Sequence, residues 1–195
     1  RDTLPPEMTQ AEQVIALTRW LRKELRKRGL PAERVDAVHA GVHPPPNRSP
    51  GDLGQRLGLT GPVVLAVGRL VRRKGQDHLI QAFPAVLEEH PTAQLLLVGQ
   101  GPDRERLEGL VEEHTLGRCV VFAGFLAPDD LEAAYGLADV FALPCREGEG
   151  GDTEGFGLVF LEAGVRGLPV VGGRTAGVVE AVVEGETGLM VEPGD

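Results

Sequence analysis

The sequence predicts a doubly wound α/β domain built on a parallel sheet. From residue 62 onward, short apolar runs alternate with segments of helical length. These runs are continuous rather than alternating apolar and polar, which is typical of parallel strands buried on both faces. Glycine is abundant, at 27 residues, and aromatic residues make up only 4% of the chain. This composition suits a sheet with tight turns and a core of Val, Leu and Ala.

The elements of this sheet can be assigned in chain order. Apolar runs predict strands at 62–67, 94–99, 119–124, 139–144 and 168–173. The segments that follow them predict helices at 77–90, 104–114, 129–137, 156–166 and 178–184. Strands that alternate with helices in this way indicate a Rossmann-like arrangement, in which ligands bind beyond the carboxyl ends of the strands.

The first 61 residues follow a different pattern. Apolar residues recur at helical spacing from Val14 to Leu25, and Gly29 is a suitable C-cap, so a helix is expected over 11–29. A short strand is expected at 35–39. The stretch 40–52 is rich in proline and glycine, which predicts a linker and a domain boundary.

Charge is distributed unevenly along the chain. Residues 1–61 hold ten basic and seven acidic side chains, a net charge of +3, whereas residues 62–195 hold ten basic and twenty-two acidic ones, a net charge of −12. An acidic body argues against nucleic acid as the main partner. Its one dense basic cluster, at 69–74, therefore suggests a small and strongly anionic ligand.

Two further features bear on the setting of the protein. Cys119 and Cys145 form no CxxC pair, so a reduced, cytosolic environment is expected. No apolar run approaches the roughly 20 residues that span a bilayer. The chain begins at Arg1 rather than at a methionine, and we expect it to be a fragment.

The loop after the first predicted strand is the first candidate site. Gly68 allows a sharp turn, and Arg69 and Lys74 then lie at the ligand edge of the sheet. An arginine fork and a lysine point charge could clamp a diphosphate there. A solvated basic turn is an equally good interpretation on position alone. Arg72 and Arg73 are expected to be solvated neighbours of the clamp.

The loop at 143–157 is the second candidate site. Gly155 and Gly157 flank Phe156 where a helix is expected to begin, and the free N–H groups of a helix start can bind an anion. Glu154 precedes this helix, and Glu162 is expected a little over two turns inside it. Both carboxylates could accept hydrogen bonds from sugar hydroxyls. Alternatively, Glu154 is a capping carboxylate on the helix dipole, and Glu162 is an exposed helix residue. For Glu162, spacing alone favours this second interpretation.

Other catalytic classes find little support. The segment GQGP at 99–102 lacks the third glycine of a dinucleotide fingerprint, which disfavours a nicotinamide dehydrogenase. The five histidines have no metal-ligand spacing, and no motif suggests a covalent hydrolase. The basic face of the helix at 11–29 could touch anionic lipid, although a solvated face is the more common explanation.

Taken together, these loops resemble the retaining glycosyltransferases of family 4, which have the GT-B architecture. The matching segments include VGRLVRRKGQDHLIQAF, LLLVGQGPDRERL, YGLADVFALPC and EGFGLVFLEAGVRGLPVV, and they occur in family order across 62–195. The resemblance implies three parts: the end of an N-terminal domain at 1–40, an interdomain linker at 41–61 and a nucleotide-sugar-binding domain at 62–195. Most of the acceptor-binding N-terminal domain and the family's last C-terminal helices would lie outside the chain.

The resemblance also assigns roles to residues. Arg69 and Lys74 match a diphosphate-binding pair, Glu154 matches the residue that binds the donor sugar, and Glu162 matches the residue that binds ribose. Arg69, Lys74 and Glu154 are the expected catalytic residues, and no metal site is expected. The remaining expected donor-binding positions are loop residues and backbone amides: Gly68, Gly124, Phe125, Gly155, Phe156, Gly157 and Leu158.

The implied activity is metal-independent transfer of a sugar, with retention, from a GDP-, UDP- or ADP-sugar to an acceptor hydroxyl, without a further cofactor. The loop REGEGGDTEGFG resembles that of GDP-mannose-dependent phosphatidylinositol mannosyltransferases, which suggests mannose, and departs from it at Glu147 and Glu149. The full enzyme would then be cytoplasmic, with contact to the inner face of the membrane. Alternatives are a non-catalytic binding module, a GT-B epimerase, or a glycogen or starch synthase.

Overall fold

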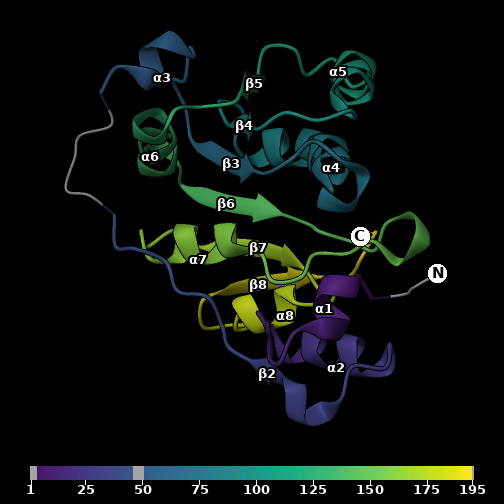
Figure 1. Ribbon diagram of the computed structural model, residues 1–195. Helices are drawn as coiled ribbons and strands as arrows, with labels where there is room; N and C mark the ends of the chain where they lie inside the picture. The colour runs from purple at the N-terminus through teal and green to yellow at the C-terminus, as the bar shows by residue number, and fades with distance from the viewer. Residues whose placement is uncertain (1–3, 46–50, 195) are drawn as a thin grey trace.

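The computed structural model describes residues 4–45 and 51–194 (Figure 1). Its main sheet has six parallel strands in the order β5-β4-β3-β6-β7-β8. In chain order these are β3 (Val63–Val67), β4 (Gln94–Val98), β5 (Val120–Gly124), β6 (Val140–Leu143), β7 (Val170–Gly173) and β8 (Gly188–Val191). This order is that of a doubly wound sheet, so the predicted fold class is confirmed.

Helices cover both faces of the main sheet. They are α3 (Leu53–Arg56), α4 (Gln76–Glu89), α5 (Arg104–Glu113), α6 (Pro128–Leu137), α7 (Leu158–Gly164) and α8 (Val178–Ala181). Figure 1 shows α4 and α5 on one side of the sheet and α3, α6 and α7 on the other. Because both faces are covered, every residue of β4 is buried, and its apolar residues at 95–98 reflect this.

The point where the strand order reverses lies between β3 and β6. The chain moves outward from β3 to β5, returns through α6, and continues outward from β6 on the other side. The loops after β3 and β6 therefore open side by side. They touch at Gly75, whose φ is +75° and where a Cβ would lie 2.0 Å from the carbonyl oxygen of Pro144. Such a reversal is where doubly wound sheets form their ligand crevice.

Two expectations at this end of the chain need correction. Helix α7 begins at Leu158 rather than at 156, because Gly157 takes up a left-handed φ of +84°. Glu162 is therefore just over one turn inside the helix, not two. Strand β8 was not predicted from the sequence, since it has only four residues and begins with glycine, yet it pairs with β7 along its whole length.

The N-terminal segment folds as a small unit beside the main sheet. The expected helix at 11–29 is wrong in its first half: β1 (Val14–Ala16) pairs in parallel with β2 (Val35–Ala37), and α2 (Arg19–Lys27) begins only after Thr18. Thr18 has an extended backbone, and its hydroxyl accepts the N–H of Leu21 at 3.0 Å, so it caps the helix. The apolar spacing predicted one continuous helix because residues of both β1 and α2 face the same small core.

Short elements also occur where the sequence predicted none. Helix α1 (Pro6–Gln10) precedes β1, and 3-10 turns occupy η1 (Ala32–Arg34), η2 (Arg72–Lys74) and η3 (Glu149–Gly151). The predicted strand at 35–39 is confirmed as β2. Part of the predicted linker at 41–61 lies outside the described residues. The second half of that linker contains α3, which packs against α6. The division into 1–40, 41–61 and 62–195 stays a prediction.

Candidate functional site

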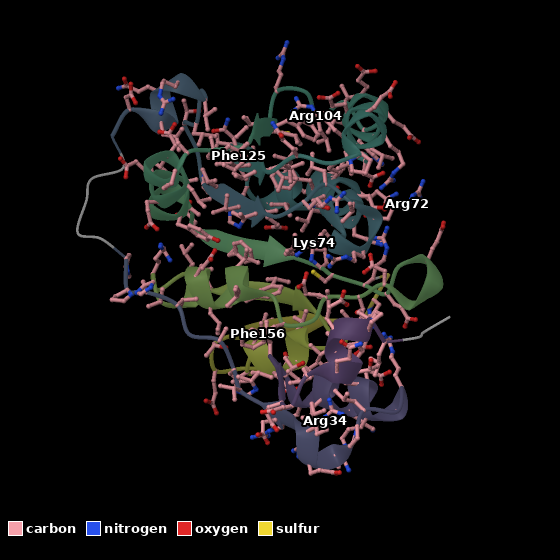
Figure 2. The ribbon with its side chains drawn as sticks, in the orientation of Figure 1. Arg34, Arg72, Lys74, Arg104, Phe125 and Phe156 are labelled. Atoms are coloured by element: carbon pink, nitrogen blue, oxygen red, sulfur yellow. The ribbon has the colours of Figure 1, made fainter. Side chains whose placement is uncertain are left out.

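Lys74 and Glu154 meet at the reversal point of the sheet. Lys74 ends the η2 turn after β3, and its side chain is only 11% exposed. Its Nζ donates a hydrogen bond to Oε2 of Glu154, which the loop after β6 supplies. Gly68 lies against the aliphatic part of this lysine, since a Cβ there would be 3.6 Å from its Cε. In Figure 2, Lys74 lies beside the carboxyl end of β6.

Arg73 belongs to the same cluster, so its expected role as a solvated neighbour is wrong. Its Nη1 donates to Oε2 of Glu154 at 3.0 Å, and its Nε lies 3.0 Å from Oδ2 of Asp152. Arg73 and Lys74 are consecutive in the η2 turn and yet reach the same carboxylate oxygen, which neither helical nor extended spacing would indicate. Arg72 is exposed, as expected.

Arg69 lies on the same loop but does not join the cluster. Its side chain is exposed, and within 4–45 and 51–194 it forms no hydrogen bond or ion pair. Its backbone carbonyl accepts a hydrogen bond from Nε2 of Gln76 at 3.1 Å, which fixes the start of the loop. The structure thus holds one expected cation in place and leaves the other free to reach a ligand.

The Glu154 carboxyl is kept ionised by its neighbours. Burial raises its pKa, but Lys74 and Arg73 lower it more, and the net direction is below the ordinary value. Both of its cationic contacts use Oε2. In the described part of the chain, Oε1 has no hydrogen-bond donor, so this oxygen can accept one from a ligand hydroxyl.

The backbone around Glu154 is held from three directions. The Glu154 carbonyl accepts the N–H of Gly177 at 3.1 Å, and the Gly155 carbonyl accepts the hydroxyl of Thr18 at 3.0 Å. Phe156 stacks on His39, with ring centroids 5.6 Å apart. Within the described residues, the backbone N–H groups of the next three positions donate no hydrogen bond: Phe156, Gly157 and Leu158. They form a short row of free donors at the start of α7.

Glu162 is not the exposed helix residue that its spacing favoured. It is half-buried, and its Oε2 accepts the phenol hydroxyl of Tyr135 on α6 at 2.7 Å. Burial raises the pKa of Tyr135 well above its usual range, and the adjacent carboxylate raises it further, so this phenol remains a donor. The two side chains line a hollow of about 260 Å³ together with Gly41, Val42, His43, Leu131, Glu132, Leu158 and Arg166.

Gly124 and Phe125 lie at the end of β5, away from the cluster. Gly124 has a φ of +67°, and the Phe125 ring is 78% exposed. Two strand spacings separate β5 from β3, which places this aromatic residue roughly 10 Å along the sheet edge from the Lys74 loop. The ring can stack against a planar group of a ligand that extends along this edge.

A second ionic cluster fixes the loop after β6, and the sequence did not indicate it. Arg146 makes two hydrogen bonds of 2.7 Å to the carboxylate of Asp77, and Nη2 of Arg106 lies 3.0 Å from the same group. The backbone N–H of Arg146 also donates to the carbonyl of Arg73 at 2.8 Å. Burial raises the pKa of Asp77, but the two arginines lower it to about 2. No motif pairs residues 69 positions apart.

The charged groups at the site are cations and carboxylates. Among the described residues, no group of three or more His, Cys, Asp or Glu side chains is arranged to hold a metal ion. In the same part of the chain, no helix has the length and apolarity that crossing a membrane requires. The buried Cys145 thiol lies near Lys74; burial raises its pKa to about 12, so it is not a nucleophile at neutral pH.

Solved structures share this architecture over nearly the whole chain. HepE from Anabaena, in complex with UDP and glucose, matches with a TM-score of 0.82 and 27% identity, over 95% of this chain and 50% of its own. Sucrose-phosphate synthase from Thermosynechococcus elongatus matches with a TM-score of 0.79 and 33% identity, over 96% of this chain and 47% of its own. The fold is that of the C-terminal half of a GT-B glycosyltransferase.

Curated relatives agree with this assignment. The GDP-mannose-dependent alpha-(1-6)-phosphatidylinositol monomannoside mannosyltransferase of Mycolicibacterium smegmatis is 38% identical over 192 residues, 95% of this chain and 50% of that protein. The protein of the same name from Mycobacterium tuberculosis is 45% identical over 141 residues, 72% of this chain and 35% of that protein. The chain thus spans half or less of these relatives. The family pattern described as glycosyl transferases group 1 matches residues 54–195, and the chain belongs to this family.

Proposed function

We propose that the chain is the donor-binding part of a retaining, metal-independent glycosyltransferase that transfers mannose from GDP-mannose to an acceptor hydroxyl. The observation that carries this proposal is the meeting of Lys74 and Glu154 at the reversal point of the sheet. It brings a buried cation and a carboxylate with a free oxygen to the place where a doubly wound sheet binds its ligand.

The diphosphate would bind beside Lys74. Two cations, Arg73 and Lys74, are paired there with the carboxylates of Asp152 and Glu154, so the cluster itself is neutral. The unpaired Arg69 on the same loop raises the local net charge to +1, on a domain that is otherwise acidic. Arg69, which is free and exposed, supplies the second charge-assisted contact. The unpaired N–H groups at 156–158 add neutral donors for phosphate or sugar oxygens.

With the diphosphate beside Lys74, positions for the sugar, the ribose and the base of the donor can be proposed. Oε1 of Glu154 would accept a hydrogen bond from a sugar hydroxyl, and Glu162, held by Tyr135, would bind the ribose at the 260 Å³ hollow. The base would lie toward β5, where the exposed Phe125 ring can stack on it.

These groups support a mechanism based on leaving-group stabilisation. As the glycosidic bond breaks, negative charge grows on the nucleoside diphosphate, and the cation of Lys74, held in place by Glu154, would stabilise it together with Arg69 once that side chain contacts the ligand. Within residues 4–45 and 51–194 we identify no covalent nucleophile, so the acceptor hydroxyl would attack from the face that the diphosphate leaves. The acceptor would bind to an N-terminal domain outside this chain, so the chain alone should bind the donor without efficient transfer.

The names of the relatives support the choice of substrates. Those proteins are GDP-mannose-dependent and act on a phosphatidylinositol monomannoside. We therefore propose GDP-mannose as donor and a mannosylated phosphatidylinositol lipid as acceptor. Glu147 and Glu149 make the loop after β6 more acidic than the subgroup pattern and are the positions where acceptor preference would differ.

A calorimetric screen tests the donor. GDP-mannose should bind at least about tenfold more tightly than UDP-glucose or ADP-glucose. EDTA should leave its affinity unchanged because side-chain cations, rather than a metal ion, bind the diphosphate. Preference for UDP-glucose would replace the mannose assignment with a glucosyl donor. A loss of more than about tenfold, or 1.4 kcal/mol, in EDTA would show that a metal takes part.

The two glutamates should differ in what they recognise. Glu162→Ala should weaken binding of free GDP by about 1–3 kcal/mol, because ribose is present in it, whereas Glu154→Ala should mainly remove discrimination between donor sugars. Tyr135→Phe is the matched control: it leaves Glu162 in place and should cost GDP binding about 1 kcal/mol or less. Equal losses of GDP affinity in Glu154→Ala and Glu162→Ala would refute this division of roles.

A further inference from the structure

The outward face of α2 concentrates positive charge. Six of the chain's 20 basic residues lie within 19–28, against one acidic residue, Glu24. Leu25 on the opposite face is buried in the small core of the N-terminal segment. Five cations line one shallow hollow of about 620 Å³, and we call them the cationic face: Arg19, Arg22, Lys23, Arg26 and Lys27.

The charges of the cationic face are poorly neutralised. Like charges four positions apart repel one another along the helix, for example Arg19 with Lys23 and Lys23 with Lys27. Lys27 pairs with Glu24 at 2.6 Å, and Arg22 donates to a backbone carbonyl. In the described part of the chain, Arg19, Lys23 and Arg26 have no acidic partner. An external anionic surface would relieve this repulsion.

Helix α2 is also fixed rigidly to the loop that carries Glu154. Thr18, which caps α2, donates its hydroxyl to the carbonyl of Gly155 at 3.0 Å. The Glu180 carboxylate accepts the backbone N–H groups of Arg19 at 2.9 Å and Trp20 at 2.7 Å. Figure 1 shows α2 at the end of the molecule farthest from β5. A surface bound to the cationic face would therefore lie at a fixed position relative to the proposed donor site.

We propose that the cationic face docks the protein on an anionic lipid bilayer. The choice of a bilayer rests on the proposed function, in which the acceptor is a membrane lipid. Geometry supports it, because α2 presents a row of charges about 14 Å long to one plane. A long nucleic acid would extend past this short row onto a domain whose net charge is −12.

Vesicle co-sedimentation of the 195-residue chain tests the proposal. The chain should bind vesicles that contain phosphatidylglycerol and should not bind vesicles of phosphatidylcholine alone. The triple variant Arg19→Gln, Lys23→Gln, Arg26→Gln should lower the partition coefficient by about a hundredfold, because each cation near the surface contributes about fivefold. Glutamine preserves helix propensity, so α2 should remain folded by circular dichroism.

A variant with the same net charge provides the control. Arg56→Gln, Arg118→Gln and Arg174→Gln remove three exposed cations elsewhere and should lower the partition coefficient less than about threefold. Equal losses in both triple variants, equal binding to neutral vesicles, or tighter binding to a short DNA duplex would each overturn the proposal. GDP affinity, measured in the same variants, should stay unchanged. If the parent chain itself does not bind GDP, that result would count against the donor site and not against the docking face.

Discussion

Lys74→Ala and Arg69→Ala should each weaken binding of a nucleoside diphosphate by about 2–4 kcal/mol, measured by calorimetry with GDP. Each substitution removes a charge-assisted contact to the diphosphate. The two variants should differ in stability. Lys74 is buried against Glu154, so its loss should also destabilise the fold, whereas the exposed Arg69 should be replaceable without such a cost.

Two comparisons isolate the diphosphate contact from these side effects. Arg72→Ala removes an exposed cation from the same turn and should cost GDP binding less than about 1 kcal/mol. Uncharged guanosine should bind almost equally to all of these variants, because it offers no phosphate. If folded Arg69→Ala and Lys74→Ala bind GDP as the parent chain does, the loop after β3 is not the diphosphate site, and the proposed function would depend on family membership alone.

Asp77→Ala should lower the free energy of unfolding by about 3 kcal/mol, a large effect for a residue outside the proposed donor contacts. The carboxylate is buried, and it holds Arg146 and Arg106 together. Its removal leaves the Arg146 guanidinium unpaired in a partly buried position, which is the costly way to break an ion pair. Urea unfolding followed by circular dichroism would measure the loss.

Exposed ion pairs give the reference for this experiment. Arg174→Ala breaks pairs with Glu184 and Glu192 at the surface and should leave the free energy of unfolding nearly unchanged. In a double-mutant cycle, Asp77→Asn and Arg146→Met together should destabilise less than the sum of the two single changes, because they share one interaction. Additive effects would show that the two side chains do not depend on each other.

The same carboxyl predicts a pH dependence of stability. The pKa of Asp77 is about 2 in the folded chain against an ordinary value of 3.8, so between these values the unfolded chain binds more protons. Its contribution, about 2 kcal/mol, is present above pH 4 and is lost as the pH falls toward 2. The parent chain should therefore lose more stability than Asp77→Asn over this interval. Parallel curves for the two proteins would contradict the assigned pair.

Periodic patterns in the sequence were sufficient for the main sheet. Apolar runs located β3 to β7 to within a residue or two, because a strand buried on both faces must be apolar throughout. Family motifs also placed Arg69, Lys74, Glu154 and Glu162 on loops and helices at one sheet edge. The helix predicted at 11–29 failed because apolar spacing cannot show that Val14 and Leu25 reach one core from two different elements.

By itself, therefore, the sequence determined the fold class, strands β3 to β7 of the main sheet and the family of the protein. Only the tertiary structure decided which charges meet: Glu154 with Lys74 and Arg73, Asp77 with Arg146, and Glu162 with Tyr135. Periodicity is a local property of the chain and can be read residue by residue. An ion pair between distant loops depends on how the strand order brings those loops together, and that order is fixed only when the whole core packs.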